Sequence, residues 1–168
     1  MTNELTAPVT GAHTTDGLPH GSTSITPHIV VSPAASAIDF YVSAFGARVL
    51  DTTRFPGSDL VAHADLDFGT GRLTLSDPLE SYGLHAANRE HTTYSLALYV
   101  TDVDGVLEAS VTAGAHVREP AMTFVSGDRF ASIVDPVGVR WSIMTRVEDL
   151  SPEESRRRVE EWSATQSG

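Results

Sequence analysis

The sequence predicts an α+β fold: two tandem βαβββ modules that form an open, cup-shaped sheet, followed by a C-terminal helix. Three observations predict it. Each half of the chain contains a strand-like segment, a helix-like segment that ends at a glycine, and three further strand-like segments. Residues of the first half recur in order in the second half. Near the end, Ser151, Pro152 and Glu154 form the capping signal of one more helix.

The first half supplies one complete unit. Residues 26–31 are typical of a strand, and residues 33–45 carry apolar side chains at the three- and four-residue spacing of a helix. Gly46 ends this helix, because glycine readily adopts the left-handed conformation found at helix C-termini. Strands are then predicted at 47–53, 60–68 and 71–76, and a polar loop at 77–92.

The second half repeats this order. A strand at 94–100 precedes a helix at 103–113, which ends at Gly114, and strands follow near 115–118, 129–134 and 139–145. Residues match at a spacing of 69 and, after one deletion, at 68. The matched pairs are Val31 and Val100, Ile38 and Leu107, Gly46 and Gly114, Asp67 and Asp135, Arg72 and Arg140, and Leu75 and Ile143. One helix cannot cover both faces of a half-sheet, so the two modules are expected to pair.

These signals divide the chain into three parts. Residues 1–24, rich in Thr, Gly, Ser and Pro, are predicted to be a flexible N-terminal tail. Residues 25–149 form the domain, with modules at about 25–76 and 94–146. Residues 150–168 hold the C-terminal helix and its tail.

Composition restricts the partners and the compartment. The 168 residues carry a formal net charge of −11 and no cysteine. An acidic surface repels phosphate backbones, so no nucleic-acid partner is expected. No apolar run approaches the ~20 residues that span a membrane, and the N-terminus lacks the pattern of a signal peptide. A cytoplasmic protein without disulfides and without a membrane partner is the simplest expectation.

Three segments are informative together: IDFYVSAFGARVL, LALYVTDVDGVLEASVTAGAHV and GDRFASIVDPVGVRWSIMTRVEDLSPEE. They resemble the glyoxalase/bleomycin-resistance/dioxygenase superfamily, also called vicinal oxygen chelate proteins, and the last segment resembles its PhnB-like branch. The resemblance covers about residues 25–155. It implies paired βαβββ modules around an open cup, a small-molecule ligand or substrate, and a homodimer.

The resemblance also implies where a metal would be held. Enzymes of this superfamily bind a divalent metal with four side chains, each His or carboxylate. Carried over to this chain, the four positions are Thr26, Thr74, Ser95 and Ser142. Neutral hydroxyls are poor ligands for Zn, Ni, Fe or Mn beside imidazole and carboxylate. We therefore expect neither the family's metal nor another cofactor.

Alternation along the strands indicates which side chains line the cup. One face of each strand is apolar and suited to pack under the helices, and the other is mixed. His28, and His63 with Asp65, lie on the mixed faces and are the acid–base candidates, because the charge of histidine is tunable near neutral pH. The residues expected to contact a ligand are Thr26, His28, Arg72, Thr74, Ser95, Tyr99, Phe124, Phe130, Arg140, Ser142 and Met144.

Three functions remain open. The first is a small-molecule-binding protein that holds an amphipathic ligand, such as an antibiotic or a metabolite, in the cup without the family's metal. The alternative is an enzyme, lyase-like or isomerase-like. It is either metal-independent, with His28 or His63 with Asp65 as acid–base, or it uses a relocated metal site. The third is a structural or regulatory dimer, in which these histidines are partly exposed polar residues of a solvated sheet. The hydroxyls at the four ligand positions favour the first function over a metalloenzyme.

Overall fold

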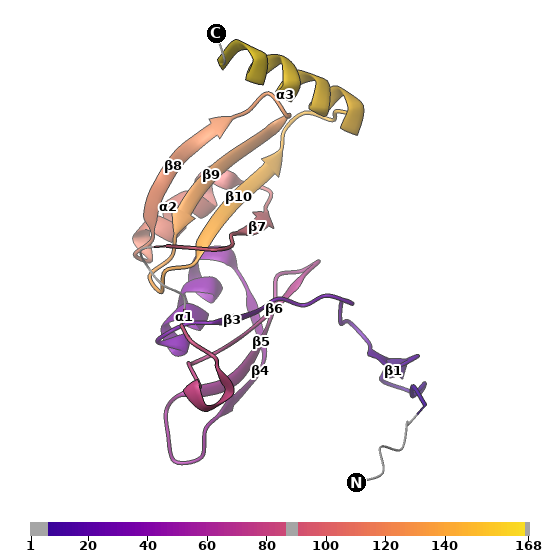
Figure 1. Ribbon diagram of the computed structural model, residues 1–168, viewed down its shortest axis with the longest axis vertical. Helices are drawn as coiled ribbons and strands as arrows, with labels where there is room; N and C mark the ends of the chain where they lie inside the picture. Colours follow the sequence, from indigo (N-terminus) through magenta and orange to yellow (C-terminus); the bar gives the residue numbers. More distant parts are fainter. Residues whose placement is uncertain (1–6, 87–90, 167–168) are drawn as a thin grey trace.

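The computed structural model describes residues 7–86 and 91–166, and these residues hold two four-stranded sheets, a short hairpin and three α-helices. Each four-stranded sheet comes from one half of the chain, and Figure 1 shows the two halves one above the other, with the C-terminal helix at one end. Residues 1–6 of the predicted tail, 87–90 of the predicted loop and 167–168 of the C-terminal segment lie outside the described residues.

Module 1 has the predicted βαβββ order. Its strands form a sheet in the order β3-β6-β5-β4, in which β3 and β6 run parallel and the other pairs are antiparallel. Its elements are β3 (His28–Val30), α1 (Ala34–Phe45), β4 (Arg48–Arg54), β5 (Val61–Asp67) and β6 (Arg72–Ser76). Gly46 ends α1 at φ 68°, in the left-handed conformation expected of it.

Module 2 repeats this topology strand for strand. Its sheet has the order β7-β10-β9-β8, with β7 parallel to β10 and the other pairs antiparallel. Its elements are β7 (Leu96–Tyr99), α2 (Val103–Thr112), β8 (His116–Thr123), β9 (Asp128–Val134) and β10 (Arg140–Arg146). The prediction of tandem βαβββ modules is therefore confirmed.

Helices α1 and α2 cover one face of each sheet and pack against each other. Side chains on that face are buried, among them Leu66 and Leu75 in module 1 and Ile133 and Ile143 in module 2. An aromatic cluster joins the modules: the ring of Trp141 lies 4.9 Å from that of Phe45 and 5.2 Å from that of Tyr41, centroid to centroid. The opposite face of each sheet, which α1 and α2 leave uncovered, is called the cup face below.

The last hairpin differs between the modules. Asp67 pairs with Arg72 in module 1, whereas Arg140, the counterpart of Arg72, pairs with Val134 in module 2. Asp135 therefore lies in a longer turn, and the predicted match of Asp67 with Asp135 is wrong in register. In that turn Asp135 is buried and accepts hydrogen bonds from donors on both modules.

The two ends of the chain add smaller elements. Ser151 caps α3 (Pro152–Gln166) by accepting a hydrogen bond from the backbone N–H of Glu154, as the sequence predicts. Residues of the predicted tail form a hairpin of β1 (Thr14–Thr15) and β2 (Leu18–Pro19), and η1 (Glu80–Tyr82) lies in the predicted loop. No helix within the described residues is long and apolar enough to cross a membrane.

Candidate functional site

The cup face of module 1 carries a polar row across its four strands. Strand pairing places His28 beside Thr74, Thr74 beside Asp65, and Asp65 beside Asp51. Because cross-strand neighbours on one face lie about 5 Å apart, these side chains form one continuous surface. The expectation that alternate residues of β3, β5 and β6 share a face is met here.

Hydrogen bonds fix the ring of His28. Its Nδ1 lies 2.9 Å from the hydroxyl of Thr74, and that hydroxyl donates to the carbonyl of Pro27 at 3.2 Å. The hydroxyl proton is thus engaged, so Nδ1 is the donor of the first bond. In the neutral ring Nε2 is then an acceptor, and it faces the hydroxyl of Ser76 at 3.3 Å.

His63 lies parallel to His28 on the same face, with ring centroids 5.9 Å apart and an interplanar angle of 5°. Partial burial of His28, and then charge repulsion from His63, lower the pKa of His28 below its usual value of 6.5. The structure therefore places a neutral imidazole with a defined tautomer on the cup face.

We expect His63→Gln to raise the pKa of His28 part of the way towards 6.5, because repulsion is removed while burial remains. Titration of the His28 ring protons by NMR in both proteins measures this. Since a lowered pKa means that the unfolded chain binds the proton more readily, the stability that neutral His28 contributes is lost as the pH falls below 6.5. A His28 pKa unchanged by His63→Gln would show that the two rings do not interact.

Asp65 is held by Arg72 within this row. One carboxylate oxygen of Asp65 lies 3.3 Å from a guanidinium nitrogen of Arg72, and the other is buried without a hydrogen-bond partner in the described part of the chain. Arg72 also reaches the hydroxyl of Ser22, at 3.5 Å. Asp65 is thus oriented by Arg72, while His63 stacks on His28, so the predicted His63–Asp65 pair is divided between two different partners.

The cup face of module 2 carries an apolar row in the corresponding place. Met144 pairs with Tyr99 on one side and with Phe130 on the other, and Phe130 pairs with Met122. Tyr99 is 59% exposed and Met122 45% exposed. These four residues, called the apolar stripe below, present aromatic and thioether groups of the kind that adapt to varied ligands.

Polar groups run beside the apolar stripe. Ser142 pairs with Ala97 and with Ser132, and Ser132 pairs with Glu119. Arg140 donates to the hydroxyl of Ser132 at 3.2 Å and to the carboxylate of Glu119 at 3.0 Å. The module 2 cup face is therefore amphipathic by itself.

Three predicted contact residues lie at the margins of the two cup faces. Phe124 packs edge-on against Trp162 of α3, with centroids 4.9 Å apart, and meets Phe130 at 6.3 Å. Ser95 precedes β7, and Thr26 precedes β3, where its hydroxyl lies 3.2 Å from that of Thr23. Thr26 and Ser95 thus lie outside the polar row and the apolar stripe, whereas Phe124 joins the stripe to α3.

Comparison with known proteins agrees with this architecture. The model of the Glyoxalase/Bleomycin resistance protein/Dioxygenase superfamily matches residues 17–143. The chain belongs to this superfamily. An uncharacterized protein from Mycobacterium bovis is 34% identical over 136 residues, which cover 78% of this chain and 88% of the relative. A Mycobacterium tuberculosis protein is likewise 34% identical, with 78% of this chain and 79% of the relative covered.

Solved structures share the fold. TioX from Micromonospora sp. ML1 is 27% identical, with a TM-score of 0.57 and coverage of 77% of this chain and 100% of that one. A PhnB protein from Bacillus cereus is 18% identical, with a TM-score of 0.57 and coverage of 73% and 99%. The second likeness shows the fold alone.

The donor groups of this superfamily member do not suit the superfamily's metal. The strand pairing sets His28 beside Thr74 and Ala97 beside Ser142. These four residues offer one imidazole, two hydroxyls and a methyl group. This set has too little charge and too few nitrogen donors to hold a transition metal tightly. Within residues 7–86 and 91–166, no three His, Cys, Asp or Glu side chains lie close enough together to share an ion.

Sequence reasoning missed three members of the two faces: Glu119, Met122 and Ser132. For Ser132 the signal was available, because it follows the alternation of its strand. Glu119 and Met122 lie in a strand with register shifts between Val117 and Met122, which alternation alone does not reveal.

Proposed function

We propose that this protein binds an amphipathic small molecule, in the manner of the glyoxalase/bleomycin-resistance type, without using the superfamily's metal. The observation that carries the proposal is that the cup faces of the two modules have the same topology but different side-chain chemistry. Module 1 presents His28, Thr74 and Asp65, whereas module 2 presents the apolar stripe with a polar row beside it. A ligand with one polar and one apolar part matches this division, because small-molecule sites combine apolar walls with a few placed polar groups.

The hydrogen-bond pattern suggests how the polar part would bind. Nε2 of neutral His28 is an acceptor whose partner in the structure is Ser76, at a long 3.3 Å. A hydroxyl or an amide N–H of a ligand would make a shorter bond there. The apolar part would cover Tyr99 and Met144, and removing their exposed apolar surface from water would stabilise the complex.

We further propose a homodimer. A chain of 17.9 kDa folded alone is expected to expose roughly 8,000 Å², whereas this chain exposes 10683 Å². The excess is of the order that one protomer buries in an obligate dimer, about 1,000–2,500 Å². We expect light scattering at micromolar concentration to give twice 17.9 kDa. A monomer mass throughout that range would contradict the dimer and leave the binding proposal to be judged separately.

Native mass spectrometry of freshly purified protein tests the binding proposal. We expect a non-covalent mass increment of a few hundred daltons per cup, or its appearance after incubation with bleomycin or with Nile red, an uncharged amphipathic dye. We also expect that increment to survive treatment with a chelator. A protein that gains mass from none of these, and whose retained mass is a metal ion, would overturn the proposal.

A second candidate is a metal-independent enzyme. The observation in its favour is the neutral imidazole of His28, held in one tautomer in which Nε2 is the basic nitrogen and has only a long contact, 3.3 Å, to the hydroxyl of Ser76. The two candidates differ in the fate of the bound compound, which is recovered unchanged from a binding protein and converted by an enzyme. Conversion that is lost in His28→Gln while binding is retained would favour the enzyme.

A further inference from the structure

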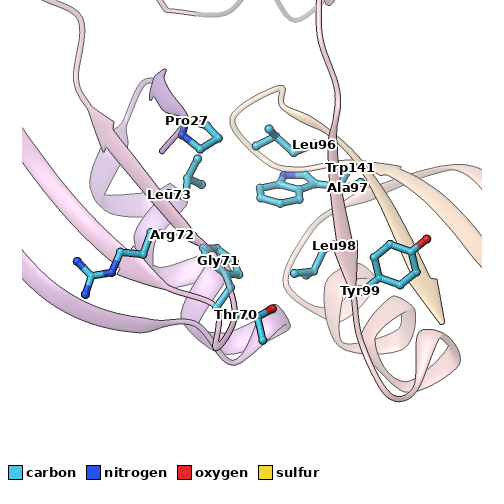
Figure 2. A pocket seen from close by; sticks show the side chains of 11 residues that line it. Pro27, Thr70, Gly71, Arg72, Leu73, Leu96, Ala97, Leu98, Tyr99 and Trp141 are labelled. Atoms are coloured by element: carbon cyan, nitrogen blue, oxygen red, sulfur yellow. The ribbon is translucent and has the colours of Figure 1, made fainter. Parts of the chain in front are cut away.

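A cavity of about 230 Å³ lies at the seam between the two modules. Figure 2 shows Pro27 and Leu73 on the module 1 side and Leu96, Leu98 and Trp141 on the module 2 side. Thr70 and Tyr99 also line it, and both are exposed residues. We call this space the seam cavity.

The seam cavity adjoins the cup faces but extends to the opposite side of the two sheets. Leu73 and Trp141 are buried on the helix side of their sheets, at 3% exposure each, whereas Met144 and Phe130 lie on the opposite side of theirs. Arg72, Ala97 and Tyr99 border both regions. Figure 2 shows the guanidinium of Arg72 directed away from Trp141. That guanidinium is engaged with Asp65. The walls around Trp141 are therefore apolar and uncharged.

An aromatic cluster forms the inner end of the seam cavity. The Trp141 ring contacts Phe45 at 4.9 Å, Tyr41 at 5.2 Å and Phe68 at 6.1 Å between centroids. Trp141 and Phe68 also line the cavity. Since aromatic rings favour edge-to-face and offset contacts at 4.5–7 Å, one more ring in the cavity would extend the cluster.

The volume limits what can enter. An apolar cavity of ~150 Å³ stays dry and binds benzene, while drug-sized ligands occupy about 300–1,000 Å³. At about 230 Å³ the seam cavity suits one or two fused rings and is too small for a whole amphipathic ligand.

We propose that the seam cavity binds an uncharged aromatic group of one or two rings, at a site separate from the cup. Trp141 and Phe68 contact the ring, Leu73, Leu96 and Leu98 enclose it, and the hydroxyl of Thr70 at the rim receives a polar substituent. The ring is either a free small molecule or the terminal ring of a longer one, and its recognition chemistry is the same in both cases.

Trp141 reports directly on this binding. The chain has two tryptophans, so full-length Trp162→Phe emits from Trp141 alone. We expect iodobenzene, whose heavy atom quenches on contact, to give saturable quenching with a Kd of roughly 0.1–1 mM, as expected for a seven-atom ligand. Toluene should reverse the quenching competitively, and benzoate should not, because its charge would be buried without a partner.

A glycine at the cavity wall offers a filling variant. A Cβ added at Gly71 meets no atom within 4 Å, so Gly71→Leu inserts a side chain beside the cavity without disturbing the core. We expect this variant to weaken iodobenzene binding at least tenfold. Gly11→Leu, where an added Cβ also meets nothing within 4 Å, is the matched control and should leave binding unchanged. If circular dichroism shows that Gly71→Leu is misfolded, Leu98→Phe fills the same space.

Three results would overturn the proposal. Quenching that rises linearly without saturation would show collisions rather than a site. Saturable quenching that Gly71→Leu and Leu98→Phe both leave intact would place the ring elsewhere. Binding that disappears between 1 and about 100 µM protein, as copies associate, would show that a second copy covers the cavity. Phe130→Ala, on the apolar stripe, should leave iodobenzene binding intact. Failure of the cup proposal, which is tested with bleomycin and Nile red, is therefore distinguished from failure of the seam-cavity proposal.

Discussion

Replacing Asp135 by alanine is expected to lower the free energy of unfolding by ~3–5 kcal/mol. The carboxylate is 4% exposed and accepts four hydrogen bonds. One oxygen accepts from the hydroxyl of Tyr41 at 2.7 Å and from the indole N–H of Trp141 at 3.1 Å. The other accepts from the backbone N–H groups of Val137 and Val139 at 3.0 and 2.8 Å. Alanine would leave these four donors without their acceptor.

The effect reaches beyond one turn, because Tyr41 belongs to α1 of module 1 and Trp141 to β10 of module 2. Asp135 therefore joins the modules at the aromatic cluster. Burial and the neighbouring carboxylate also raise the pKa of Tyr41, which keeps its hydroxyl a donor. Chemical denaturation followed by circular dichroism measures the loss.

Two variants make the result interpretable. Tyr41→Phe removes the inter-module bond alone and should cost about 1–2 kcal/mol. Asp67→Ala tests the sequence counterpart, whose side chain is 19% exposed and pairs at 2.6 Å with the largely exposed Arg48. It should change stability far less, because solvent screens that pair. Equal losses from Asp135→Ala and Asp67→Ala would show that burial of the Asp135 network contributes nothing.

The sequence predicts the fold more completely than the site. The periodicities around residues 33–45 and 103–113 and the glycines after them correspond to α1 and α2, because helix spacing and left-handed caps are local properties. The N-terminal hairpin of β1 and β2 went unpredicted, since two-residue strands show no alternation. β8 extends to Thr123, beyond the predicted 115–118, because its bulges interrupt the pattern.

Alternation along a strand predicts the face on which a side chain lies, but it does not predict the neighbour of that side chain on the next strand. His28, Thr74 and Met144 lie on the cup faces as predicted from their strands. The neighbour of Thr74 is His28 rather than Thr26, and the neighbour of Ser142 is Ala97 rather than Ser95. Parallel strands joined through a whole module have no local signal for their register, so these pairings required the structure.

Placing a charge in the apolar stripe tests the cup directly. We expect Met144→Asp to weaken Nile red binding about 100-fold, because the ligand's apolar part would then cover an unpaired carboxylate, and each tenfold loss corresponds to 1.4 kcal/mol. Met144 is the centre of the stripe, between Tyr99 and Phe130. Its side chain is partly exposed, so the fold should tolerate the change. Dye fluorescence titration measures the affinity.

The comparison that decides this prediction is with a charge placed elsewhere. Val111→Asp introduces the same carboxylate on α2, at a valine that is 48% exposed and lies away from the cup face. That variant should bind Nile red as the unchanged protein does. Met144→Gln, which keeps the length of the side chain without adding a charge, should lower the affinity for Nile red by an intermediate amount. It also replaces Met144→Asp in the test if that variant is unstable. Affinities that are the same for Met144→Asp and Val111→Asp would mean that the dye binds outside the cup. The seam cavity would not be that second site, because at about 230 Å³ it is too small to hold the dye.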